Sequence, residues 1–157
     1  MAITLLALSC LGGAHPAAAQ TTLDQLEPFS FGLFSLKDNN SAHELQIDAA
    51  TNMATNDAAF VIDQPAQRGE YRLSGFTPGT EVTVSIDNGG LTLNGGGGTA
   101  VFAIVNYTIS PATLIADGSG NIDFYVGATL RTLGNGVTYD SGTYADDLDI
   151  TFDWIPD

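Results

Sequence analysis

The stretch TYADDLDITFDW, residues 143–154, decides the fold of this chain. From Leu148 to Trp154 every second residue is apolar, and the residues between them are aspartate or threonine. This period of two is typical of a β-strand with one buried face and one wet face. The aspartates require water or partners, so their face of the strand must be exposed. The apolar side chains on the other face must cover an apolar surface. A two-layer β-sandwich provides both environments.

The composition agrees with an all-β protein. The chain has 157 residues, of which 44% are hydrophobic and 18 are glycine, and this content suffices for one packed core. Short apolar segments recur between turn signals, and no helical pattern follows residue 20. We therefore predict a single domain over residues 20–157, an immunoglobulin-like Greek-key β-sandwich of about seven to nine antiparallel strands.

The same patterns place the individual strands. They cover residues 29–36, 43–49, 58–62, 70–74, 81–87, 91–93, 99–110, 121–130 and 148–154. Turn residues predict that 29–36 and 43–49 form one hairpin, that 70–74 and 81–87 form another, and that 50–57 form a loop. The cleanest internal alternation directs five side chains inward: Ile122, Phe124, Val126, Ala128 and Leu130.

The charge limits the classes of partner. The 18 acidic residues outnumber the 4 lysines and arginines, and the resulting net charge of −14 repels nucleic acid and anionic lipid. Two interpretations of the acidity stay open, namely solubility in a salty medium and cation binding.

Residues 1–19 have the pattern of a signal peptide. An apolar run over residues 3–11 is broken by two glycines, and three alanines at 17–19 predict cleavage before Gln20. The run is too short for a stable membrane span, so we expect a secreted, periplasmic or cell-surface protein. No Lys or Arg precedes the run, and residues 7–10 vaguely resemble a lipobox at Cys10, which leaves a lipoprotein as the alternative. After cleavage before Gln20 no cysteine remains, so no disulfide forms.

One loop has the composition of a calcium site. Oxygen-bearing side chains recur at every second position, at Asp117, Ser119, Asn121 and Asp123, as a loop around a hard cation requires. The sixth position is Ile122 where such loops have glycine, and no bidentate glutamate follows. Asp-Gly and Ser-Gly are also ordinary turn pairs, so a hairpin turn is the favoured interpretation and calcium the alternative.

The sequence carries no motif that names a reaction. His43 is the one histidine after the leader, and neither a Gly-x-Ser-x-Gly elbow nor a histidine pair for a metal occurs. The four glycines at 95–98 lack the Lys-Ser/Thr that closes a phosphate-binding loop. We therefore assign no catalytic residue and no cofactor, and we expect a protein that is not an enzyme.

Several short motifs resemble a known family. They are VGATL at 126–130, a glycine-rich connection, SGTY at 141–144, Phe31-Gly32 and the Pro-Gly-Thr at 78–80. Over residues 29–154 this pattern resembles the bacterial family called domain of unknown function 4402. The resemblance implies an exported immunoglobulin-like sandwich without assigned activity, similar in some members to pilin subunits.

The leading functional hypothesis is a structural or adhesive surface protein, either a pilus or filament subunit or a coat component. Its partners would be further copies or other envelope and pilus proteins. A filament subunit needs an exchangeable strand, and residues 23–36 are the candidate donor, with Leu23, Phe29, Phe31 and Leu33 as its apolar side chains. The alternative is that this segment is the first strand of its own domain.

The second hypothesis is an extracellular carbohydrate- or calcium-binding module. Tyr125 and Tyr139 are the side chains that could stack on a sugar, and the loop at Asp117 is the candidate ion site. Tyrosines on sheets also commonly pair across strands, so the pattern alone leaves this open.

Overall fold

The structure is a computed structural model that describes residues 20–86, 92–95, 100–145 and 148–155. The predicted leader, the glycine run at 96–98 and the start of the strand predicted at 91–93 lie outside these residues. The described chain contains no helix and thirteen strands. They are β1 (Thr22–Glu27), β2 (Leu33–Leu36), β3 (Glu44–Ile47), β4 (Ala54–Asn56), β5 (Phe60–Gln64), β6 (Gly69–Ser74), β7 (Glu81–Ile86), β8 (Thr92–Gly95), β9 (Phe102–Ser110), β10 (Leu114–Ile115), β11 (Ile122–Arg131), β12 (Tyr144–Ala145) and β13 (Ile150–Trp154).

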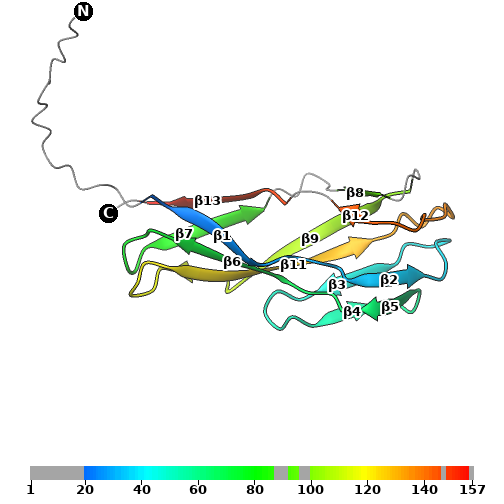
Figure 1. Cartoon of the computed structure of the whole chain (residues 1–157), viewed down its shortest axis with the longest axis horizontal. Coiled ribbons are helices and arrows are strands. Elements are labelled where there is room, and N and C mark those ends of the chain that lie inside the picture. The colour runs from blue at the N-terminus through cyan, green and yellow to red at the C-terminus, as the bar shows by residue number, and fades with distance from the viewer. Residues whose placement is uncertain (1–19, 87–91, 96–99, 146–147, 156–157) are drawn as a thin grey trace, which may run out of the picture.

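The strands form one large sheet and two small ones, and all their pairings are antiparallel. The large sheet has the order β1-β6-β11-β9-β8-β12, and β3 pairs with β11 and carries β4. The small sheets, β10-β7-β13 and β2-β5, lie at opposite ends of the elongated molecule (Figure 1). The prediction of an all-β protein is confirmed.

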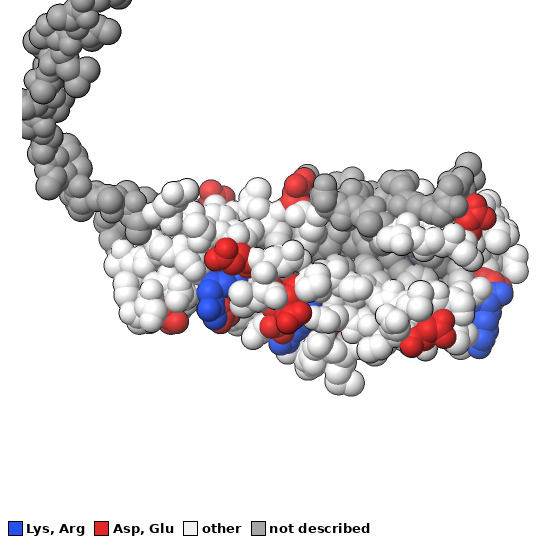
Figure 2. Space-filling view, viewed as in Figure 1, with Lys and Arg blue, Asp and Glu red and all other residues white. Residues whose placement is uncertain are grey.

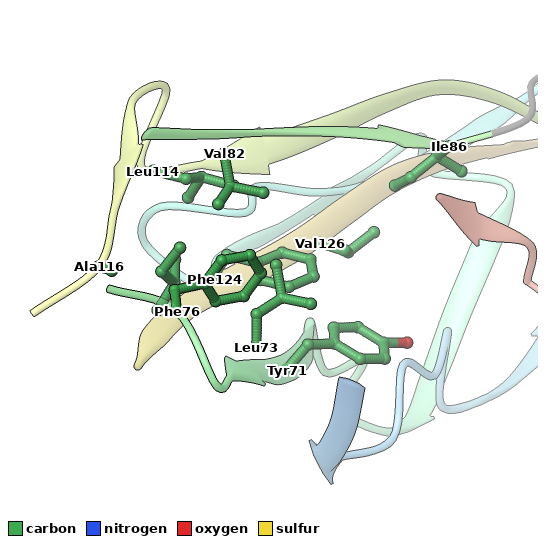
Figure 3. Close-up of a cluster of buried hydrophobic side chains, with 10 residues drawn as sticks. Tyr71, Leu73, Phe76, Val82, Ile86, Leu114, Ala116, Phe124 and Val126 are labelled. Atoms are coloured by element: carbon green, nitrogen blue, oxygen red, sulfur yellow. The ribbon is translucent and has the colours of Figure 1, made fainter. Parts of the chain in front are cut away.

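Two apolar clusters hold the small sheets against the large one. In the first cluster Val82 and Ile86 of β7 face Tyr71 of β6 and Phe124 of β11 (Figure 3). In the second cluster Phe34 of β2 and Phe60 of β5 face strands β3, β9 and β11. The second layer of this sandwich-like arrangement is therefore divided in two.

Strand β11 is the structural centre of the large sheet. It pairs with β6 and then β3 along one edge, and with β9 along the other. All five side chains that the sequence directed inward are buried, as predicted. Each such large aliphatic or aromatic side chain contributes about 1.5–3 kcal/mol of transfer free energy. Because Phe124 and Val126 belong to the first cluster and Ala128 and Leu130 to the second, β11 connects the two.

The terminal strand forms as predicted, but its apolar face is only half covered. β13 pairs with β7 from Ile150 opposite Ile86 to Trp154 opposite Val82. Leu148, Ile150 and Phe152 are partly buried, and Trp154 stays 38% exposed. The reason is that β13 is an edge strand with β7 as its one partner in the described sheet.

Both predicted hairpins are wrong. β2 pairs with β5, whereas β3 pairs with β11 and β4. β6 belongs to the large sheet and β7 to a small one, so their connection crosses between layers. Residues 50–57, predicted as a loop, contain β4. Turn residues show where the chain reverses, but they do not show whether it returns to the same layer.

Candidate functional site

A groove of about 900 Å³ opens at the gap in the second layer. One wall is β2 with its flanking residues, over positions 29–40, and the other is the segment 136–144. The base consists of apolar side chains from β9 and β11: Phe102, Ile104, Tyr107 and Leu130. The groove thus lies over the second cluster, whose residues Phe102, Ile104 and Leu130 are buried beneath it.

Aromatic rings line the groove closely. The rings of Phe102 and Tyr139 are stacked, with centroids 4.1 Å apart, and the Tyr144 ring stands edge-on to Phe102 at 5.0 Å. The Phe34 ring of β2 meets Phe102 from the opposite wall at 5.6 Å. Phe102 therefore lies at the point where the two walls converge.

The Tyr139 hydroxyl fixes one wall in place. It donates to the Val101 carbonyl at 3.1 Å and accepts the Leu133 N–H at 3.0 Å. Burial raises the pKa of Tyr139 above its ordinary value, so the hydroxyl keeps its proton and both bonds at neutral pH. The sequence marked Tyr139 as a sugar contact, but one ring face and the hydroxyl already have partners.

Asn39 ties the two walls together at one end. Its buried side chain accepts the Gly134 N–H through Oδ1 and donates through Nδ2 to the Val137 carbonyl, both at 2.9 Å. The Asn39 carbonyl also accepts the Gly136 N–H at 2.7 Å. Gly134 has a φ of 65°, and a Cβ there would strike the backbone of residues 41 and 42, so the loop requires glycine.

The groove-facing edge of β2 is unpaired within the described strands, because β5 is its one partner there. The Lys37 N–H bonds the Ala59 carbonyl at 2.9 Å, toward β5. Since successive N–H groups of a strand point to alternate edges, those of Phe34 and Leu36 point away from β5 and into the groove. The edge thus offers backbone donors and acceptors beside an apolar base.

The described lining of the groove carries few charges on a strongly acidic protein. Of the 26 described residues that line it, three are charged: Lys37, Asp38 and Asp140. Elsewhere the cations are paired with acids, as on the face in Figure 2, and the pairs include Arg68 with Glu70 and Arg131 with Glu44. Most of the acidic residues of the described chain therefore lie outside the lining of the groove.

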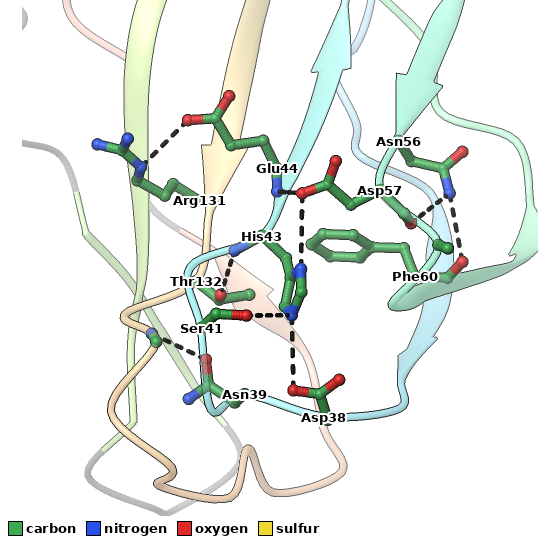
Figure 4. Close-up of polar contacts among 12 residues, drawn as sticks. Asp38, Asn39, Ser41, His43, Glu44, Asn56, Asp57, Phe60, Arg131 and Thr132 are labelled. Carbon is green, nitrogen blue, oxygen red and sulfur yellow. Dashed lines mark hydrogen bonds and ion pairs between the residues drawn. The ribbon is translucent and has the colours of Figure 1, made fainter.

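A serine, a histidine and an aspartate meet at the base of β3 (Figure 4). His43 Nε2 lies 3.3 Å from Ser41 Oγ, and His43 Nδ1 lies 3.5 Å from Asp57 Oδ2. The order of groups is that of a Ser-His-Asp triad. The sequence did not reveal this cluster, because Asp57 comes close to His43 only through the pairing of β3 with β4. Asp38 Oδ1 also lies 3.6 Å from Nε2, on the side where a catalytic base must accept a proton. The cluster joins two turns, and an anion beside the base opposes nucleophilic catalysis.

The predicted calcium residues form a turn between β10 and β11. Asp117 Oδ1 accepts the N–H groups of Ser119 at 2.8 Å and Asn121 at 2.9 Å, and these bonds lower the pKa of Asp117, that from Asn121 most. Both Asp123 oxygens accept hydrogen bonds from Arg72, at 2.6 and 2.8 Å, and this pairing lowers the pKa of Asp123. Among the described residues no group of three His, Cys, Asp or Glu side chains could hold a metal. Calcium binding stays a prediction.

The candidate donor residues occupy two places. Leu23 lies on β1 opposite Leu73 of β6, in the large sheet of its own chain. Phe29, Phe31 and Leu33 line the groove wall, with the first two rings edge-to-face at 5.0 Å. In this structure the second half of the candidate donor is thus part of the surface that surrounds the groove.

Tyr125, the other candidate sugar contact, is covered by a cation. The Arg68 guanidinium lies 3.5 Å from its ring centroid and donates to the carbonyls of Ala49 and Ala50. This face of the ring is therefore unavailable for stacking on a ligand.

Comparisons with known proteins complete the description of the chain. No helix in the described residues has the length and hydropathy to cross a membrane. Searches of curated proteins and of solved structures gave no significant match. The family model described as "Domain of unknown function (DUF4402)" matches residues 21–154, which is most of the chain. The resemblance found in the sequence is thereby confirmed, and the protein belongs to the DUF4402 family.

Proposed function

We propose that this protein is an exported, non-enzymatic structural or adhesive component of the bacterial surface, either a filament subunit or a coat component. Its framework would be an immunoglobulin-like Greek-key sandwich with an open position in its second layer. The observation that carries the proposal is the groove beside the edge of β2 that no described strand pairs with. An open edge next to an apolar base is suited to strand addition, which is how many assembly proteins join.

The chemistry of the groove supports assembly over catalysis. Its described lining is dominated by aromatic, aliphatic and small polar side chains, and its two carboxylates, Asp38 and Asp140, lie on opposite walls. Among the described residues that line the groove, no two groups with shifted pKa values lie together as an acid and a base would. The export part of the proposal rests on the leader pattern at residues 1–19.

Expression of the full chain with a C-terminal tag in a Gram-negative bacterium tests the proposal. We expect a mature N-terminus at Gln20 by mass spectrometry, accumulation outside the cytoplasm, and large native complexes after mild crosslinking of intact cells. A protein that keeps residues 1–19 and stays in the cytoplasm as a monomer contradicts the proposal.

The second candidate is a carbohydrate-binding module, with or without calcium. The observation that favours it is the pair of partly exposed rings along the groove, Tyr139 and Tyr144, which pack on the buried Phe102, since sugars pack on exposed ring faces. Calorimetric titration of the mature chain with neutral oligosaccharides distinguishes the two. Saturable heat that disappears in Tyr144→Ala supports this candidate over assembly.

A further inference from the structure

The edges of the described sheets differ in how they are protected against pairing. Natural sheets block their edges with charges, prolines or very short strands. β1 carries Asp24 and Glu27 and is followed by a proline, β5 carries Asp63 and is followed by a proline, and β13 carries Asp153. The edge strands β4, β10 and β12 have three residues or fewer.

β2 is the exception among these described edges. Its sequence, Leu33-Phe-Ser-Leu36, contains neither a charge nor a proline, and Leu33 is 52% exposed. The register shift between Leu33 and Phe34 and the Lys37 that follows the strand are its interruptions, and the uncharged edge between them is a site for pairing with another strand. Because the edge borders the groove, an added strand would also cover the exposed side chains of Leu33 and Val137 on its walls, above a base that is already buried.

The charge of the surroundings restricts the occupant. The near absence of charge in the groove favours an uncharged segment, whereas the net charge of −14 attracts basic residues and repels acidic ones. A second copy is disfavoured, because its terminal segments carry Asp24 and Glu27 at one end and five aspartates after residue 145 at the other. Two molecules of the same high charge also repel each other.

We propose that the groove binds an extended peptide segment of a partner protein, with alternating apolar side chains in an uncharged core and Lys or Arg at its flanks. The segment pairs with the groove-facing edge of β2 and places its apolar side chains on the base. The pairing edge is β2, Leu33–Leu36, so about four residues of the segment pair with it, at roughly 3.3 Å per residue. This inference rests on the proposed assembly function and names the partner of that site.

The test uses the mature chain from Gln20 and three synthetic peptides with one alternating Thr-Val core. The flanks are two lysines, two serines or two aspartates on each side. By fluorescence anisotropy at 50 mM NaCl we expect the lysine-flanked peptide to bind about tenfold or more tightly than the aspartate-flanked one, with the difference falling below about threefold at 500 mM as charges are screened.

Two matched variants locate the binding site. Leu33→Lys places a charge on the β2 edge, and Leu26→Lys makes the same change on β1, at a side chain that is 46% exposed. Circular dichroism should show both variants folded. We expect Leu33→Lys to weaken binding at least about tenfold and Leu26→Lys to leave it within about twofold.

Amide hydrogen exchange reads the pairing directly. On binding, the N–H groups of Phe34 and Leu36 should gain protection, whereas that of Lys37 is already bonded to Ala59 and should change little. Binding without protection of Phe34 and Leu36 overturns strand addition, and equal affinity for all flanks overturns the charge argument. A mature chain that dimerises, and loses its dimer in Leu33→Lys, shows that a second copy is the occupant and overturns the proposal.

The inference and the proposed function fail separately. Native surface complexes without any peptide binding refute the groove as the site but leave the assembly function standing. Peptide binding by a chain that stays in the cytoplasm refutes the proposed function and leaves the groove as a peptide site.

Discussion

The stacked rings of Phe102 and Tyr139, 4.1 Å apart and inclined by 17°, join β9 of the large sheet to the loop that forms one wall of the groove. The contact makes the wall part of the apolar cluster, so the shape of the groove depends on the stability of the fold.

Tyr139→Phe should keep the stack but lose both hydroxyl hydrogen bonds, at a cost of about 1–2 kcal/mol in the free energy of unfolding. Tyr139→Ala removes the ring as well and should cost about 3–4 kcal/mol. Urea denaturation measures both. Tyr144→Phe, which loses one exposed bond to the Asp140 carbonyl, is the control and should cost about 0.5 kcal/mol. Equal stability of Tyr139→Phe and the native chain would contradict this account.

Asn39→Ala should destabilise the chain by about 2–3 kcal/mol, because it leaves the Gly134 N–H and the Val137 carbonyl without their partner. Thermal unfolding and urea titration measure the loss. The neighbouring exposed Asn40→Ala should stay within about 0.5 kcal/mol of the native chain. If both variants behave alike, Asn39 does not hold the walls together.

Asp117 and Asp123 predict a loss of stability in acid. Their pKa values are lowered in the folded chain, so their contributions are present above the unfolded value near 3.8 and disappear as the pH falls through the lowered values. Asp117→Asn should flatten this decline between pH 4 and pH 2, as followed by urea unfolding.

The same variant distinguishes the two interpretations of the loop, a hairpin turn and a calcium site. If Asp117 is occupied by backbone N–H groups, millimolar calcium should raise the melting temperature of the native chain by less than about 1 °C. A larger increase that Asp117→Asn abolishes would establish the calcium loop.

Ser41 should not react with a fluorophosphonate probe, because Asp38 lies beside the same His43 nitrogen that would have to remove the serine proton. Intact-mass spectrometry should show no adduct under conditions in which a known serine hydrolase is fully labelled. An adduct that is lost in Ser41→Ala would instead reveal an active triad and refute the non-enzymatic function.

Removal of residues 20–28 should leave a folded chain, since of the β1 side chains Leu23 alone is half-buried and the others are exposed. We expect a loss of about 1–2 kcal/mol. Removal of residues 20–36 also deletes Phe31 and Phe34 and should unfold the protein, at about 3–5 kcal/mol for each ring. Light scattering and circular dichroism follow both truncations. A folded 37–157 chain that takes up the missing peptide in trans would support the donor-strand hypothesis.

The alternation of apolar and polar residues predicted those strands that have one buried face and one exposed face. β11 and β13 were found because their side chains alternate between two different environments, and the inward face of β11 is buried as expected. The layer of each strand was not predictable in this way. β2 and β3 are neighbours in sequence, yet they belong to different sheets. The turn residues between them do not determine which sheet the following strand joins.

The groove was hidden for the same reason. It exists because the segments 29–40 and 136–144 face each other as its walls, a relation between residues about a hundred positions apart. Asn39 resembled any other turn residue in the sequence, and its role depends on the loop at 133–137 that returns beside it. The sequence did contain one usable signal, the absence of any charge or proline from Phe29 to Leu36.

The two ends of the described chain meet at the β6–β7 connection. The Gln20 carbonyl lies against Gly75, where a Cβ would collide with it, and the Trp154 ring stands edge-on to Phe76 at 5.3 Å. The groove opens beyond the far end of β11, whose ten residues span roughly 33 Å. If the molecule is tethered to a support or to a fused neighbour by either terminus, the groove therefore lies at the end of the molecule farthest from the tether. It stays accessible to a ligand from that end.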